Sequence, residues 1–283
     1  MIDRIKRLTI SALVSDNSLM GTLVLKGGNA LDLAYNITIR GSMDIDFSLE
    51  TDFTELEKNR IRDDLEHLLN SEFIKEELVV FDVKLSEKPK VIEDAVKDFW
   101  GGYLVEFKII SLEDYKTYED NFEDIRRNAI ALHANNSPKF TIDISKYEYV
   151  AKKVAKDLEG AIVYVYTPEM LAIEKLRALC QQNPKYKDIV LKMTPKSRAR
   201  DFFDIYNINE SFTIDFKSEE NVKLCQNIFE AKRVPMEYIK ELDAQRDLHK
   251  ESWERVLNTI DPAIVPEDFD FYFDYVLKLF SHL

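Results

Sequence analysis

Two aspartates separated by one residue, Asp44 and Asp46, follow a paired glycine turn at Gly27 and Gly28. In an extended strand alternate side chains point to the same face, so both carboxylates would project together while Ile45 points the other way. Neighbouring carboxylates resist joint ionisation, and a site that keeps both charged usually holds a divalent cation between them. Their hard oxygen atoms favour Mg2+ or Mn2+. The spacing therefore predicts a metal site on this strand.

The paired glycines lie between an apolar segment at 23–25 and a helical run at 29–35. Glycine lets backbone N–H groups approach a phosphate closely, and a helix N-terminus favours negative charge. Arg40 and Ser42 precede the aspartates and would add a guanidinium and a hydroxyl to the same anion. A glycine pair alone is usually only a turn, and a D-x-D sequence alone is usually a solvated strand edge. Their order along the chain favours a phosphate and metal site.

The segments KGGNAL and RGSMDIDFS resemble the nucleotidyltransferase AbiEii/AbiGii toxin family, a branch of the DNA polymerase beta-like nucleotidyltransferases. In that superfamily a third carboxylate comes from a later strand, and the segment KFTIDIS offers Asp143 for this role. The resemblance implies that Asp44, Asp46 and Asp143 hold the metal ions. Many superfamily members carry Gly-Ser in the turn, whereas here Gly28 is followed by Asn29. Either Asn29 or Ser42 would then supply the phosphate contact.

Two later segments extend the resemblance. The segment TPEMLAIEKLRALC at 167–180 begins with a cap threonine and a proline that are typical of a helix start, and it carries Lys175 in an apolar stripe. A lysine there either extends to solvent or serves a site, and the resemblance implies contact with the NTP triphosphate. The segment RARDFFDIY at 198–206 resembles the family's R-x-x-D block and contains Asp201. Asp201 either positions Lys175 or the acceptor, or forms an ion pair that merely joins two helices.

Composition is ordinary for a soluble globular protein, with 283 residues, 45% hydrophobic and 32% charged. No apolar run approaches the roughly eighteen residues that span a bilayer, and the N-terminal segment 1–16 is expected to form an amphipathic helix rather than a signal sequence. We therefore expect a cytoplasmic protein without membrane contact. Cys180 and Cys225 are too few for a disulfide framework, and the four scattered histidines form no zinc pattern.

Charge is distributed by segment. The formal net charge of -13 argues against nucleic-acid binding if it were spread evenly. Residues 174–200, however, contain eight basic and two acidic residues, whereas 201–283 contain nine basic and eighteen acidic ones. The basic stretch would hold a triphosphate, an RNA backbone or both, although such a stretch is more often a solvated face. The acidic C-terminal part would instead meet a basic partner.

The order of expected elements predicts an α/β (α+β) fold. An N-terminal polymerase beta-like nucleotidyltransferase domain with a mixed sheet is expected at 1–166, followed by a helical C-terminal domain at 167–283. The charged segment 87–98 is expected to be a surface loop. Strands are expected near 78–85, 103–111, 139–145 and 161–166, and helices near 53–70 and 112–132.

The resemblance implies a metal-dependent nucleotidyltransferase toxin of a toxin–antitoxin system. Such toxins transfer NMP from an NTP to RNA, with the 3′ end of tRNA the usual acceptor, and a cognate antitoxin protein or its regulator is encoded beside them. One alternative is a nucleotidyltransferase acting on a small hydroxylated molecule such as an aminoglycoside. Another is a non-catalytic protein of the same fold that binds a nucleotide or a partner, although an intact set of three carboxylates counts against it.

Overall fold

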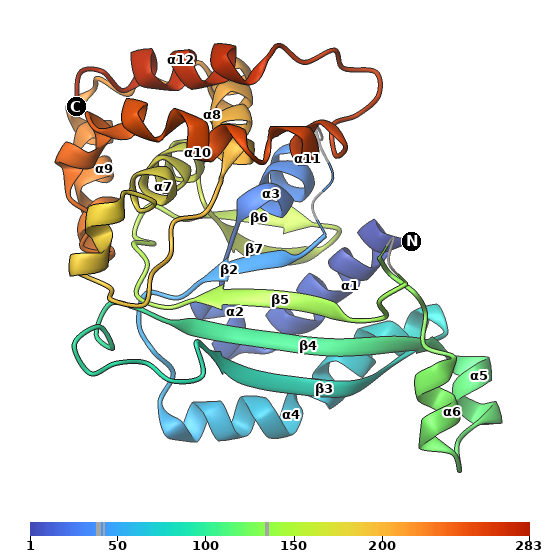
Figure 1. Cartoon of the computed structure of the whole chain (residues 1–283). Helices are drawn as coiled ribbons and strands as arrows, with labels where there is room; N and C mark the ends of the chain where they lie inside the picture. The colour runs from blue at the N-terminus through green and yellow to red at the C-terminus, as the bar shows by residue number, and fades with distance from the viewer. Residues whose placement is uncertain (38–40, 42, 134–135) are drawn as a thin grey trace.

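The computed structural model describes residues 1–283 except 38–40, 42 and 134–135. Within these residues a mixed seven-stranded sheet has the order β3-β4-β5-β2-β1-β7-β6 (Figure 1). β2 pairs with β5 and β1 pairs with β7 in parallel, whereas the remaining neighbours are antiparallel. The predicted α/β fold with a mixed sheet is confirmed. The strands are β1 (Val24–Lys26), β2 (Ile45–Ser48), β3 (Leu78–Lys88), β4 (Gly102–Ser111), β5 (Phe140–Ser145), β6 (Val154–Leu158) and β7 (Ala161–Val165).

Helices cover both faces of the sheet. Helices α1 and α4 lie on one face, and α3 and α7 to α12 lie on the other (Figure 1). The helices are α1 (Ile2–Ser15), α2 (Asn17–Thr22), α3 (Gly27–Asn29), α4 (Glu55–Phe73), α5 (Leu112–Thr117), α6 (Phe122–Arg127), α7 (Pro168–Cys180), α8 (Ala199–Phe212), α9 (Glu219–Ala231), α10 (Arg246–Lys250), α11 (Trp253–Leu257) and α12 (Phe269–Leu279). Shorter helical turns are η1 (Ala30–Ala34, a π-helix), η2 (Ile74–Glu76), η3 (Pro184–Asp188), η4 (Met236–Ile239) and η5 (Leu242–Gln245).

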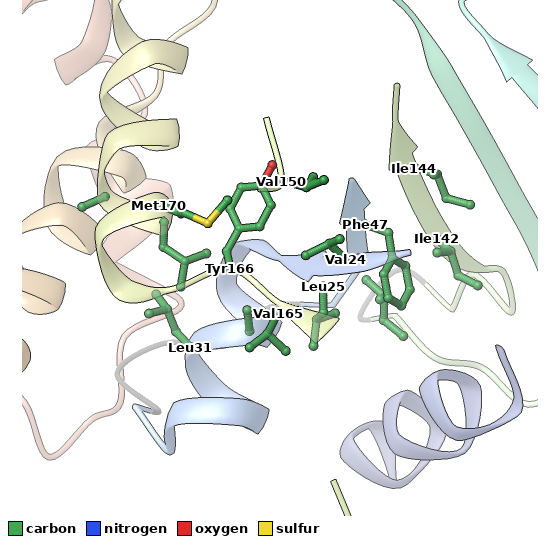
Figure 2. Close-up of a cluster of buried hydrophobic side chains, with 14 of the residues drawn as sticks. Val24, Leu25, Leu31, Phe47, Ile142, Ile144, Val150, Val165, Tyr166 and Met170 are labelled. Atoms are coloured by element: carbon green, nitrogen blue, oxygen red, sulfur yellow. The ribbon is translucent and has the colours of Figure 1, made fainter. Parts of the chain in front are cut away.

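Strand alternation separates an apolar face of the sheet from a polar one. Leu25, Phe47 and Ile142 are completely buried and come together from three neighbouring strands, β1, β2 and β5 (Figure 2). Asp46 directly precedes Phe47 and Asp143 directly follows Ile142, so the side chains of the two aspartates lie on the opposite face of the sheet. The apolar alternation thereby fixes the register of the strands, because a slip of one residue would bury the aspartates.

Two differences from the predicted elements have local causes. The helix expected at 112–132 is divided into α5 and α6, because Asn121 accepts hydrogen bonds from the backbone N–H groups of Glu123 and Asp124 and starts a new helix. Strand β6 was not predicted from the sequence. It is one of the two edge strands of the sheet and carries Lys156 and Asp157, and such charged residues are common at sheet edges.

The strands all precede Pro168, and the described chain after that residue is helical. Buried side chains from both parts belong to one continuous hydrophobic core, so the predicted division into domains at residue 166 stays a prediction. No helix in the described part of the chain is long and apolar enough to cross a membrane. Cys180 and Cys225 are buried and free. The sequence likewise predicts no disulfide framework.

Candidate active site

The site is built around Asp46 of β2 and Asp143 of β5. These residues are directly opposite each other in the parallel β2–β5 pair, so their side chains leave the same face of adjacent strands, about 5 Å apart at the backbone. The pKa of Asp46 is raised to about 6, mainly by burial; the charges of Lys26 and Arg200 oppose this rise, and those of Asp143 and Glu174 add to it. Two hard carboxylates brought together at a partly buried position have the chemistry of a divalent cation site.

The glycine turn packs directly against this carboxylate. Gly27 has a φ of +70°, and a Cβ at this position would lie 2.5 Å from Oδ2 of Asp46. Asn29, which is completely buried, donates from Nδ2 to the backbone oxygen of Asp44 at 2.5 Å. The glycine turn therefore contacts the aspartate segment twice, once by close packing and once by a hydrogen bond. The amide nitrogen of Asn29 serves this contact, so the phosphate contacts predicted for Gly28 and Asn29 stay predictions.

Gly27→Ala is expected to reduce the free energy of unfolding by about 1–3 kcal/mol, the usual strain of a non-glycine residue at positive φ. The added Cβ would also push the Asp46 carboxylate away, so the site should be lost in any folded fraction. Urea denaturation followed by circular dichroism measures the effect. Gly21→Ala is the matched control, because a Cβ there meets nothing within 4 Å and should leave stability unchanged or improve it. Equal stability of the two variants would contradict the expectation.

Asp44 has its own hydrogen-bond partner on β5. Its carboxylate Oδ1 accepts a hydrogen bond of 2.5 Å from the hydroxyl of Thr141, which lies two residues before Asp143 on β5. Within the described ranges, no three His, Cys, Asp or Glu side chains converge closely enough to hold a metal ion. The structure thus brings Asp46 and Asp143 together, and the predicted three-carboxylate set stays a prediction. Arg40 and Ser42 lie outside the described residues.

A buried charge network, which the sequence analysis missed, supports the site from one side. Lys26 lies opposite Asp46 on β1, and its Nζ is 3.4 Å from Glu148, 3.7 Å from Glu174 and 3.2 Å from the Ser145 hydroxyl. Only 7% of Lys26 is exposed. A lysine at the end of an apolar strand, directly before the glycine pair, was the signal that would have revealed it.

Glu148 is the centre of this network. Burial alone would raise the pKa of Glu148, but the charges of Lys232, Lys26 and Arg177 outweigh burial and hold it at about 2. Lys232, just after α9, also donates to the backbone oxygens of Phe99 and Lys146. Glu148 therefore connects the sheet to the C-terminal helices through groups that lie far apart in the sequence.

Lys175 and Asp201 form a second buried cluster between α7 and α8. Nζ of Lys175 lies 3.1 Å from Asp201 and 2.5 Å from Asp204, and Nε of Arg198 lies 2.5 Å from Asp201. Burial would raise the pKa of Asp201, but Arg198, Lys175 and Arg200 lower it well below its usual range. These contacts are those of an ion pair that joins two helices, one of the two roles expected for Asp201. The contact of Lys175 with a triphosphate stays a prediction.

Much of the positive charge at 174–200 is already neutralised. Five of its eight basic side chains form ion pairs with carboxylates, and these are Lys175, Arg177, Lys185, Lys192 and Arg198. Arg200 is exposed at the start of α8, near enough to Asp46 to lower its pKa. The excess of basic residues in this stretch therefore serves the fold at least as much as it serves an anionic ligand.

The chain matches the family model described as "Nucleotidyl transferase AbiEii toxin, Type IV TA system" over residues 10–275. Among solved structures, JHP933 from Helicobacter pylori is 16% identical with a TM-score of 0.48, over 98% of this chain and 88% of that one. A protein of H. pylori described as a possible nucleotidyltransferase is 17% identical with a TM-score of 0.47, over 98% and 90%. An antigenic nucleotidyltransferase-like protein from Paracoccidioides brasiliensis is 14% identical with a TM-score of 0.35, over 81% and 93%. No curated protein matches the chain.

Proposed function

Because the chain belongs to the AbiEii family of nucleotidyltransferase toxins of type IV toxin–antitoxin systems, we propose that it transfers NMP from an NTP to an RNA hydroxyl and releases pyrophosphate. The family implies a nucleotide substrate and an antitoxin partner. One observation carries the proposal for this chain: Asp46 and Asp143 project side by side from parallel strands, next to a turn in which only glycine fits against Asp46. The proposed acceptor is the 3′ end of tRNA.

The proposed roles follow from position. Asp46 and Asp143, joined by Asp44 once it leaves Thr141, would hold Mg2+ or Mn2+, which when bound would neutralise charge on the attacking and leaving oxygens. The partly buried pair of carboxylates fits such an ion. Lys26 keeps the Asp46 side of the site in place through its fixed contacts. Arg200, exposed beside the pair, would contact the triphosphate.

An RNA acceptor is supported by exposed basic side chains. Lys139, directly before β5, is exposed and forms a surface ion pair with Glu106, which a phosphate group can replace. Lys187 and Lys196 are exposed on the segment between α7 and α8. Because the whole chain carries a net charge of -13, local groups of this kind would have to supply the attraction for phosphate. The same groups would attract a small acceptor only weakly.

The experiment that tests the proposal is incubation of the protein with total tRNA, Mg2+ and each α-labelled NTP in turn. The expected result is transfer of label to tRNA with at least one NTP, with matching release of pyrophosphate, and loss of both when EDTA is added. Transfer of label to an added aminoglycoside but not to tRNA would show that the acceptor is a small hydroxylated molecule instead of RNA. Failure to release pyrophosphate with any NTP and either acceptor would refute transferase activity and favour a non-catalytic binding protein.

Lys175→Met is expected to lower stability by about 3–5 kcal/mol, because it leaves Asp201 and Asp204 buried together without their shared ammonium. If Lys175 also contacts the triphosphate, the folded variant should show a KM for NTP raised about tenfold, the loss of one charge-assisted contact of roughly 1.4 kcal/mol. Asp204→Asn is the matched variant, because it weakens the same bridge but keeps the lysine. An unchanged KM in folded Lys175→Met would reduce Lys175 to a link between helices.

A further inference from the structure

Lys88, the last residue of β3, reaches the candidate site from one edge of the sheet. Its Nζ lies 2.5 Å from Oδ1 of Asp143. Lys88 is opposite Gly102 of β4, which in turn is opposite Ser145 of β5. Since cross-strand partners share a face and Ser145 lies two residues from Asp143, the lysine lies on the face that carries the carboxylate pair.

The sheet is built so that this side chain can reach Asp143. Two strand spacings separate β3 from β5, about 10 Å, which a lysine covers only by extending across β4. The position between them is Gly102, where a Cβ would come within 2.2 Å of the backbone oxygen of Ile144. The close approach of β4 and β5 therefore requires glycine here, and no side chain at 102 stands between Lys88 and β5.

The two lysines beside the carboxylates differ in environment. The side chain of Lys26 is only 9% exposed and is enclosed by Glu148 and Glu174. The side chain of Lys88 is 55% exposed, and its contact with Asp143 is that of a surface ion pair. Such exposed pairs contribute little to stability and are readily exchanged for another partner. Lys26 is therefore a permanent counter-charge, whereas Lys88 is a replaceable one.

We propose that the Lys88 ammonium neutralises Asp143 in the absence of a divalent cation. When a cation binds Asp143 instead, Lys88 would be free to contact the phosphates of the incoming NTP. This inference rests on the proposed function, because it assigns Asp143 to the metal. An ammonium and a divalent cation compete for the same carboxylate oxygens, so the free protein keeps Asp143 neutralised until the metal arrives. Once a cation is bound to Asp143, the ammonium of Lys88 would lie on the same face of the sheet as the reacting phosphates and would add positive charge near them.

The test measures Mn2+ binding to the full-length protein by electron paramagnetic resonance at low ionic strength. Lys88→Met is expected to bind Mn2+ alone about two- to fivefold more tightly than the wild type, the range given by an exposed ion pair. With α,β-methylene-ATP present, the same variant is expected to bind the Mn2+–nucleotide complex about two- to fivefold more weakly. The opposite signs of the two changes distinguish this role from a general effect of charge.

Lys84→Met is the matched control. Lys84 is on the same strand and face and is exposed, but its position lies opposite Glu106 rather than near Asp143, so Mn2+ affinity should stay as in the wild type. In the Asp143→Asn background, replacing Lys88 should no longer tighten Mn2+ binding. Wild type and Lys88→Met with equal affinity for Mn2+ would overturn the competition, and unchanged nucleotide affinity would overturn the phosphate contact. Absence of Mn2+ binding in every variant would instead refute the metal site of the proposed function.

Discussion

Asp46→Asn is expected to lower the rate of NMP transfer about a thousandfold while leaving the protein folded. A carboxylate that holds the metal supplies several kcal/mol of transition-state stabilisation, and each 1.4 kcal/mol or so is a factor of ten in rate. Asparagine has nearly the same shape but lacks the charge. The measurement is transfer of label from the preferred α-labelled NTP to tRNA under single-turnover conditions.

Stability separates this prediction from simple damage to the fold. Burial raises the pKa of Asp46 to about 6 from an ordinary value of 3.8, so at pH 7 the folded state disfavours the charged carboxylate relative to the unfolded chain. Removing the charge should therefore leave the free energy of unfolding unchanged or increase it. Asp63→Asn, on the exposed surface of α4 across the sheet, is the control and should change neither property. Full transfer activity in Asp46→Asn would disprove the assignment of the site.

Glu148→Gln is expected to reduce the free energy of unfolding by about 3–5 kcal/mol, the usual effect of removing one partner from a buried ion pair. Glu148 is 4% exposed and faces three positive groups, on Lys26, Arg177 and Lys232. Glutamine would leave these groups buried without their central counter-charge. Urea denaturation at pH 7 measures the loss. Glu220→Gln, which removes a fully exposed ion pair with Lys152, should leave the unfolding midpoint unchanged.

The same substitution should show a defined pH dependence. Glu148 has a pKa of about 2 in the folded protein against an ordinary value of 4.5. Its contribution to stability is therefore complete above pH 4.5 and is lost as the pH falls from 4.5 towards 2. The difference in unfolding free energy between wild type and Glu148→Gln should shrink through that window. A difference that stays constant from pH 6 to pH 3 would show that the charge of Glu148 is not what stabilises the network.

The parts of the site that the sequence predicted are those set by local patterns. Alternation along MDIDFS and TIDIS placed Asp46 and Asp143 on polar faces of apolar strands, and the parallel pairing of those strands brings them together. The positive φ at Gly27 agrees with the expectation of a glycine turn. Fold class was equally accessible, because the strands are apolar segments and the chain after Pro168 carries helical periodicity.

The parts that escaped prediction depend on contacts between distant segments. Lys26, Glu148 and Lys232 form one network, yet Glu148 and Lys232 each resemble an ordinary surface charge in the sequence. The same is true of Lys88, whose partner is two strands away. Asp44 shows the limit of a local rule, since alternation predicted its direction but not its hydrogen bond to Thr141. Pairing across a sheet decides these cases, and no short pattern encodes it.

The position of Lys232 has a consequence for synthesis of the protein on the ribosome. Glu148 belongs to the part of the chain that contains the strands, but one of its positive partners is made more than eighty residues later, at the end of α9. A nascent chain that stops before Lys232 leaves this carboxylate without that ammonium and leaves the carbonyl groups of Phe99 and Lys146 without their donor. The sheet therefore reaches its final stability only after the segment that carries Lys232 has emerged, which delays assembly of the site until α9 has been made.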